Sequence, residues 1–220
     1  MLNFYQLDEV KKHTSKSHNP NFNLHNLELP FRMLVIASSG GGKSNFVCNL
    51  LKLFCRGNGT FDEVIIFCKS KHEPLYEYLE EASKGSIVVT EDLSKLPKVN
   101  DLDNNTQKLY IFDDLVLDKN PLVSDYFIRG RKKGVSLIFL TQSFYNTPKI
   151  IRQNCRYFVL LKLSGSRDLQ MIMKDLSIGK SKNELLELYE YATREKFSVL
   201  LIDNDRTEDK FRKNFTEYLK

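Results

Sequence analysis

Residues 33–44 (MLVIASSGGGKS) join a short apolar run to a glycine-rich loop, and a helical pattern follows to about residue 54 with Phe46, Leu50 and Leu53 on one face. A strand that enters such a loop and leaves it as a helix is typical of a phosphate-binding site. Glycine lets successive N–H groups converge on phosphate oxygens, and the helix N-terminus adds the positive end of its dipole. The segment therefore predicts a nucleotide-binding α/β protein.

The loop matches the pattern G-x-x-x-x-G-K-[ST], except that Ala37 takes the first glycine position. A methyl group there requires a backbone angle that an L-residue can adopt. Lys43 is expected to reach the β- and γ-phosphates, and the Ser44 hydroxyl to coordinate Mg²⁺. The alternative is a flexible turn with a merely solvated lysine. The expected nucleotide-binding residues are Ser39, Gly40, Gly41, Gly42, Lys43, Ser44 and Asn45.

A second acidic element ends the hydrophobic stretch 108–114 (KLYIFDD). A buried strand can hold a carboxylate at its end only when the charge has a partner, and Mg²⁺ on a nucleotide is such a partner. We expect Asp113 to serve the metal and Asp114 to polarise the attacking water as catalytic base. The alternative is a strand end followed by an ordinary Asx turn.

Further candidates flank the next strand, 135–140 (VSLIFL). Gln142 follows it and is expected to act as a sensor that contacts the γ-phosphate and the attacking water. Arg129 and Arg131 precede it and are candidates for an arginine finger, a group worth about 10³–10⁵ in rate, with Arg152 a weaker one. The same basic cluster also fits a solvated helix end or a surface that grips DNA phosphates.

The rest of the chain alternates strand and helix patterns, which predicts a mostly parallel sheet flanked by helices. Further strands are expected at 63–68, 86–90, 156–163 and 197–202, and a polar loop at 91–107. Helices are expected after Pro74, from Pro121, over 169–176, and over 185–192 behind a Ser181–Glu184 capping box. We divide the chain into an N-terminal arm (1–30, extended at 13–26), an ATPase domain (31–204) and a charged C-terminal helix (205–220).

Composition places the chain among ordinary globular proteins, with 41% hydrophobic and 28% charged residues in 220. The net charge of +5 permits nucleic-acid binding without demanding it. No apolar run approaches the roughly 18 residues of a membrane span, so none is expected. The cysteines are predicted to be reduced and buried, because two lie in apolar stretches and no export signal is expected. The histidines are predicted to lie on the surface, and neither set has metal-ligand spacing.

Three segments carry a family resemblance: MLVIASSGGGKSNF, LYIFDDL and RGRKKGVSLIFLTQSFYNTPKIIRQNC. Together they resemble the FtsK–HerA superfamily of P-loop ATPases, and most of all the genome-packaging ATPases of poxvirus-like large DNA viruses and virophages. The resemblance covers roughly residues 31–165. Within it Lys43 and Ser44 match the Walker A motif, Asp113 and Asp114 the Walker B pair, and Gln142 the sensor. Ala37 replaces the usual glycine and Asp114 the glutamate common elsewhere.

The resemblance implies a RecA-like ASCE core that assembles as a homo-oligomeric ring with ATP and Mg²⁺ at its interfaces. Hydrolysis would drive double-stranded DNA into a preformed capsid, with capsid or portal-vertex proteins as further partners. The expected location is the host cell cytoplasm or virus factory, with association to the virion also expected.

Two other functions remain open on the sequence. A P-loop nucleotide or nucleoside kinase would share Lys43 and Ser44, and the basic cluster 129–133 could mimic an arginine-rich lid. A non-catalytic, nucleotide-dependent DNA-binding module would keep its function without Asp114. A translocase differs from both because DNA should stimulate its ATPase activity.

Overall fold

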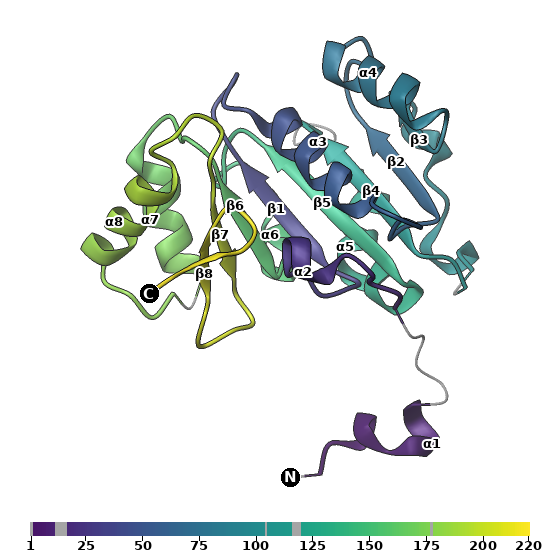
Figure 1. Ribbon diagram of the computed structural model, residues 1–220, viewed down its shortest axis with the longest axis horizontal. Coiled ribbons are helices and arrows are strands. Elements are labelled where there is room, and N and C mark those ends of the chain that lie inside the picture. Colours follow the sequence, from purple (N-terminus) through teal and green to yellow (C-terminus); the bar gives the residue numbers. More distant parts are fainter. Residues whose placement is uncertain (1, 12–16, 104, 116–119, 177) are drawn as a thin grey trace.

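The structure is a computed structural model that describes residues 2–11, 17–103, 105–115, 120–176 and 178–220. In this part of the chain one sheet runs in the order β3-β2-β4-β5-β1-β6-β7-β8-β9 (Figure 1). Its strands are β1 Arg32–Ile36, β2 Glu63–Phe67, β3 Ile87–Thr90, β4 Lys108–Asp113, β5 Val135–Thr141, β6 Tyr157–Leu160, β7 Leu200–Asp203, β8 Phe211–Lys213 and β9 Glu217–Leu219.

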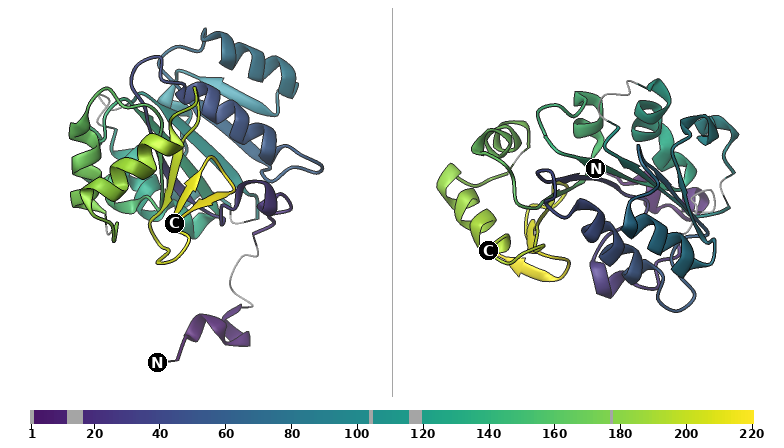
Figure 2. Two further views of the ribbon diagram at one scale, coloured as in Figure 1. Left: turned by 60° about the vertical axis from the view of Figure 1, so that its left-hand side comes forward. Right: turned by 90° about the horizontal axis from the view of Figure 1, so that it is seen from above.

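Helices cover both faces of this sheet, whereas α1 and η1 lie apart from it (Figure 1, Figure 2). The helices are α1 Asp8–Lys11, α2 Phe22–His25, α3 Lys43–Phe54, α4 Pro74–Ser83, α5 Pro121–Arg129, α6 Lys149–Asn154, α7 Ser166–Asp175 and α8 Lys182–Ala192, with 3-10 turns η1 Phe4–Gln6, η2 Leu93–Lys95, η3 Val99–Asp101 and η4 Gly130–Lys133. Because side chains alternate along a strand, Met33 and Val35 pack with α3 and α4, whereas Leu34 and Ile36 pack with α5 to α8.

The strands from β3 to β6 are all parallel, as the sequence predicted. Ile36 at the end of β1 pairs with Thr141 at the end of β5, and Asp113 at the end of β4 pairs with Leu140. The loops that follow these three strands therefore leave the sheet at the same edge. In open parallel sheets this carboxyl edge is where ligands bind.

Several predicted boundaries change. Strand β6 ends at Leu160. Strand β7 begins only at Leu200, because Phe197 has a positive φ of 69° that interrupts an extended chain. The expected polar loop 91–107 contains η2 and η3 and buries three apolar side chains in the core: Leu96, Val99 and Leu102.

The C-terminal helix predicted for 205–220 is wrong. Residues 211–213 and 217–219 form the antiparallel strands β8 and β9, which extend the sheet beyond β7. Asn214 starts the connection between them with a φ of 56°, a left-handed conformation that asparagine tolerates. Strand β8 pairs with the edge of β7, so strand pairing overrides a composition that favoured a helix.

The N-terminal arm also differs from its prediction. Residues 13–16 lie outside the described residues, but 22–25 form the short helix α2, closed by Asn26 at a φ of 51°. The arm does cover the core, because His25 and Leu27 are fully buried, and Leu27 packs in the cluster that contains the apolar face of α3. In the described ranges, no helix combines the length and apolar character that crossing a bilayer requires.

Candidate nucleotide site

The glycine loop turns tightly between β1 and α3. The Gly41 N–H donates to the Ser38 carbonyl oxygen at 2.9 Å, and α3 begins at Lys43 after Gly42, whose φ is 98°. A β-carbon on Gly41 would lie 2.8 Å from that same carbonyl, so the turn requires glycine there. Ala37 is fully buried and is not among the residues with positive φ, which explains why alanine fits the first position of the motif.

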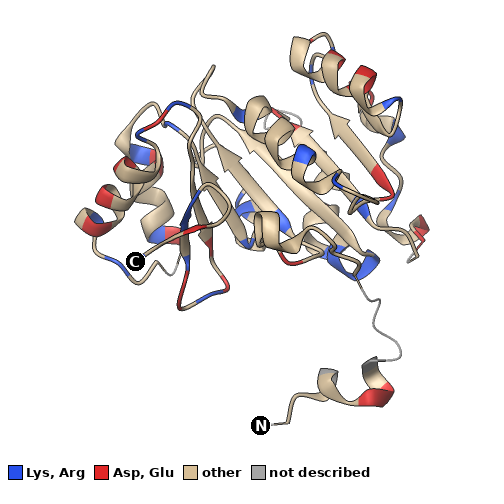
Figure 3. Cartoon of the chain, viewed as in Figure 1, with Lys and Arg blue, Asp and Glu red and all other residues tan. Residues whose placement is uncertain are grey.

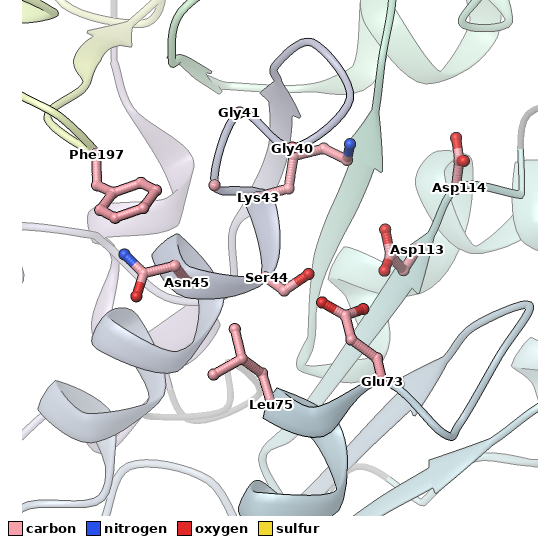
Figure 4. A pocket seen from close by; sticks show the side chains of 11 residues that line it. Gly40, Gly41, Lys43, Ser44, Asn45, Glu73, Leu75, Asp113, Asp114 and Phe197 are labelled. Carbon is pink, nitrogen blue, oxygen red and sulfur yellow. The ribbon is translucent and has the colours of Figure 1, made fainter.

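One cavity of about 440 Å³ joins this loop to the end of β4 (Figure 4). Its lining brings together most of the residues predicted from the two motifs: Gly40, Gly41, Gly42, Lys43, Ser44, Asn45, Asp113 and Asp114. Ser39 lines a neighbouring cavity that shares Gly40 and Gly41 with the first. Glu73, Leu75 and Phe197 complete the lining. The loop and the paired aspartates thus face one space.

Asp113 is a buried carboxylate with one free oxygen. Its side chain is 8% exposed, its Oδ2 accepts a hydrogen bond from the Tyr76 hydroxyl at 2.6 Å, and its Oδ1 has no partner. Burial raises the pKa of Asp113; the Tyr76 hydrogen bond and Lys43 oppose the rise, while Glu73 and Asp114 add to it. A buried carboxylate oxygen that faces a cavity without a partner is suited to receive a cation.

Asp114 lies half-buried at a bend in the backbone. Its φ of 55° is a left-handed conformation, and its N–H donates to the Leu140 carbonyl at 3.2 Å. Such conformations persist only where the surrounding structure holds them, and they cluster at functional sites. The Gln142 side-chain amide donates to Asp114 Oδ2 at 2.8 Å. The structure therefore brings the predicted sensor into contact with the predicted catalytic base.

Glu73 is a third carboxylate that the sequence analysis missed. It is the N-cap residue of α4, directly before Pro74, and its side chain points toward Ser44 and Asp113 (Figure 4). Its charge contributes to the raised pKa of both Asp113 and Tyr76. No motif marks Glu73, because it lies in the loop between β2 and α4, outside both nucleotide-binding motifs. The sequence signal nearest to it was Pro74, which predicted that a helix follows.

The oxygens of this site fit a nucleotide-bound Mg²⁺. The described residues contain no group of three or more His, Cys, Asp or Glu placed to hold an ion by themselves. Magnesium, however, binds typically through one or two protein oxygens together with substrate phosphates and water. The Ser44 hydroxyl and the unpartnered Oδ1 of Asp113 supply such oxygens on one side of the cavity.

The predicted arginines lie away from the cavity. Arg129 pairs with Asp125 in α5 and with Asn100, and Arg131 belongs to η4, before the first residue of β5. This is the amino edge of the parallel strands, opposite to the phosphate loop (Figure 3). Arg152 is held by Asp175 at 2.7 Å and lies over the Phe144 ring. A finger role for any of them would require a second subunit.

Two predictions about the remaining candidates need correction. His25 is fully buried rather than on the surface, and burial followed by the charge of Arg212 lowers its pKa to about 4. The sequence did not indicate the burial of His25, because a helix of one turn leaves little hydrophobic periodicity. All four cysteines are free, but Cys55 is exposed and Cys48 half-buried, so only Cys68 and Cys155 behave as predicted.

Comparison with known proteins identifies relatives. A family model described as "Poxvirus A32 protein" matches residues 76–213. The DNA packaging protein OPG160 of Monkeypox virus is 24% identical over 178 residues, which cover 74% of this chain and 57% of that protein. The Vaccinia virus (strain Copenhagen) counterpart is also 24% identical, with 64% of its length covered. The chain thus spans less than two thirds of these relatives.

Solved structures share the fold. The genome packaging NTPase B204 from Sulfolobus turreted icosahedral virus 2, in complex with AMP, superimposes with a TM-score of 0.58 at 15% identity, over 86% of this chain and 98% of that one. EssC (ATPases 2 and 3) from Geobacillus thermodenitrificans gives a TM-score of 0.55 at 13% identity, over 86% of this chain and 40% of that one. At these identities the similarity concerns the fold.

Proposed function

The chain belongs to the poxvirus A32 protein family, and on that premise we propose that it is an ATPase that drives double-stranded DNA into a viral capsid. The observation that carries the proposal is the single cavity that joins Lys43 and Ser44 to Asp113 and Asp114. The OPG160 relatives are DNA packaging proteins, which supports coupling of hydrolysis to the movement of DNA.

Each residue has a role in this proposal. The glycine loop and the N-terminus of α3 bind the phosphates, and Lys43 neutralises the β- and γ-phosphates. Ser44 and Asp113 would hold Mg²⁺, which, when bound, offsets charge on the phosphate oxygens. Gln142 holds Asp114 through the hydrogen bond between their side chains.

Hydrolysis then needs an oriented water. Asp114 accepts a proton as the water oxygen bonds to the γ-phosphorus, and the bond from that phosphorus to the bridging oxygen breaks to give ADP and phosphate. Asp is one methylene shorter than Glu, and the left-handed backbone at Asp114 is a local feature that repositions its carboxylate. We infer that this conformation compensates for the shorter side chain.

The oligomer and partners belong to the same proposal. A homo-oligomeric ring would bring Arg129 or Arg131 of one subunit toward the nucleotide of the next, since within one chain these side chains lie at the opposite edge. Double-stranded DNA and capsid or portal-vertex proteins are the proposed partners. The infected host cell, in its cytoplasm or virus factory, is the proposed location.

The test measures ATP hydrolysis and native mass on the same sample, with and without long double-stranded DNA. We expect hydrolysis to rise with DNA and to accompany an oligomer. Asp114→Asn should abolish hydrolysis, and Asp101→Asn, an exposed carboxylate in η3, is the matched control. ATP turnover that is indifferent to DNA and transfers the γ-phosphate to a small acceptor instead of water would indicate a kinase. Nucleotide binding without any turnover would indicate a passive DNA-binding module.

A further inference from the structure

An aromatic side chain presses on the phosphate loop from outside the motifs. Phe197 precedes β7, is 45% exposed, and lines both the phosphate cavity and the neighbouring one. A β-carbon on Gly42 would lie 2.5 Å from Cδ1 of Phe197, so the ring packs directly on that glycine. The ring is therefore not packed in the core. Nearly half of its surface stays accessible beside the cavity.

The backbone around Phe197 holds the ring in place. Its φ of 69° is unusual for a bulky residue and is a sign of local strain. The Ser198 N–H donates to the Glu195 carbonyl at 3.1 Å, and the Val199 N–H donates to Asn214 Oδ1 at 3.2 Å. A tight turn and the C-terminal hairpin thus fix an exposed ring in a strained conformation, which points to a function beyond packing.

The polarity of the cavity sets the direction of a bound nucleotide. Asp113 and Asp114 lie on one side of Lys43, whereas Asn45 and Phe197 lie on the other (Figure 4). The γ-phosphate belongs at the acidic end, where the metal and the catalytic base act. The nucleoside must then leave the loop toward the end that holds Phe197.

A second cavity with polar groups in its lining lies on the Phe197 side of the loop. The neighbouring cavity measures about 360 Å³ and shares Gly40, Gly41 and Phe197 with the phosphate cavity. Lys162, Thr193 and Ser198 also line it, and they offer hydrogen-bonding groups around the ring. A flat apolar face with polar groups at its margin matches a nucleobase, which has a π-face and polar edges.

We propose that Phe197 is the stacking platform for the nucleobase of the bound nucleoside triphosphate. The proposal rests on the proposed function, since it needs a nucleotide in the phosphate loop. Phe197 then binds the base, while Lys43 and the glycines bind the phosphates. Because stacking accepts any π-face, this residue contributes affinity for nucleosides more than choice among bases.

The chain contains no tryptophan, so Phe197→Trp creates a single fluorescent reporter at the platform. We expect MgATPγS to quench this fluorescence, because the base stacks on the indole, and magnesium tripolyphosphate to bind without quenching it. Phe4→Trp, at a 65% exposed position in η1, is the control that neither ligand should affect. Equal responses to both ligands would overturn the platform, because tripolyphosphate has no base.

Calorimetry on Phe197→Ala separates stacking from loop support. We expect MgATPγS to bind about tenfold more weakly, as one lost stacking contact predicts, with tripolyphosphate affinity within about twofold of wild type and Phe197→Tyr close to wild type. Equal losses for both ligands would mean that the ring only supports Gly42. An unchanged ATPγS affinity with a lower native mass would assign the ring to a subunit contact. If wild type bound neither ligand, the proposed function itself would fail.

Discussion

Asp113 and Arg212 are two buried charges that the fold treats in different ways. Asp113 is 8% exposed, accepts one hydrogen bond, and has one unpartnered oxygen beside a cavity. Arg212 is 2% exposed; its Nη1 donates to the carbonyl oxygens of His25, Asn26 and Phe215 at 3.0–3.2 Å, while its Nε has no partner. It lines neither cavity beside the phosphate loop.

The difference separates a structural charge from a functional one. Arg212 joins the C-terminal hairpin to the N-terminal arm through partners that the chain itself provides, so it contributes stability. Asp113 is left with an unsatisfied oxygen and like charges nearby, so it is destabilising until a ligand arrives. Removing each charge by mutation should therefore have opposite effects: loss of Asp113 lowers hydrolysis, and loss of Arg212 lowers stability.

The largest effect is expected from Asp113→Asn, which should lower ATP hydrolysis by about 10²–10³-fold because the metal loses an anionic oxygen. The free energy of unfolding without nucleotide should stay constant or rise, since the amide removes a buried charge near Glu73 and Asp114. Steady-state kinetics and chemical denaturation measure both quantities. Destabilisation with unchanged turnover per folded molecule would assign Asp113 the structural role.

Arg212→Leu should show the reverse pattern. We expect the free energy of unfolding to fall by about 3 kcal/mol, because one buried and two partly buried carbonyls lose their donor. The ATPγS affinity of the folded protein should stay unchanged. Arg56→Leu, at an exposed position after α3, is the control and should change stability by less than about 0.5 kcal/mol. A loss of affinity without a loss of stability would refute the distinction.

The arm itself should make stability depend on pH. His25 accepts the Leu27 N–H at Nδ1 while it is neutral, and its pKa in the folded state, about 4, lies below the ordinary 6.5. The unfolded chain therefore binds the proton more tightly, so the stability present above pH 6.5 is lost as the pH falls toward 4. We expect about 1–2 kcal/mol between pH 7 and pH 5.

Denaturation at several pH values measures this loss. His25→Asn, which keeps an acceptor but does not titrate, should flatten the dependence in this window. His72→Asn changes an exposed histidine and should leave it as in wild type. An identical slope in His25→Asn would show that the arm is not the source.

Glu73→Gln should have the smallest effect. Removing this charge weakens the attraction of the cavity for a cation, so we expect a rise of about three- to tenfold in the Mg²⁺ concentration needed for ATPγS binding. Glu77→Gln changes an exposed residue of the same helix and is the control. Equal Mg²⁺ requirements in both variants would remove Glu73 from the site.

The features that the sequence predicted correctly are those that short local patterns encode. The glycine loop, the apolar run ending in Asp113 and Asp114, and the strand before Gln142 each carry a short-range signal, and the parallel sheet then places them at one edge. The sequence showed that Arg129 and Arg131 are charged but not at which edge of the sheet they lie. The structure puts them at the amino edge, so their finger role stays a proposal about a second subunit.

What the sequence missed depends on long-range contacts. Glu73 reaches the site only because α4 packs beside α3, and Phe197 reaches Gly42 because β7 pairs with β6. The C-terminal segment looked helical by composition, but the edge of β7 and the left-handed Asn214 make it a hairpin. Tertiary pairing of this kind is invisible to local propensity.

We propose that the cavity between the glycine loop and the paired aspartates binds MgATP. Isothermal titration calorimetry of MgATPγS against wild type and Lys43→Ala tests it most directly, with the unfolding midpoint of each nucleotide-free protein measured on the same preparation. We expect tight binding to wild type and an affinity at least about 100-fold weaker for Lys43→Ala at an unchanged midpoint. Wild-type affinity in Lys43→Ala would contradict it.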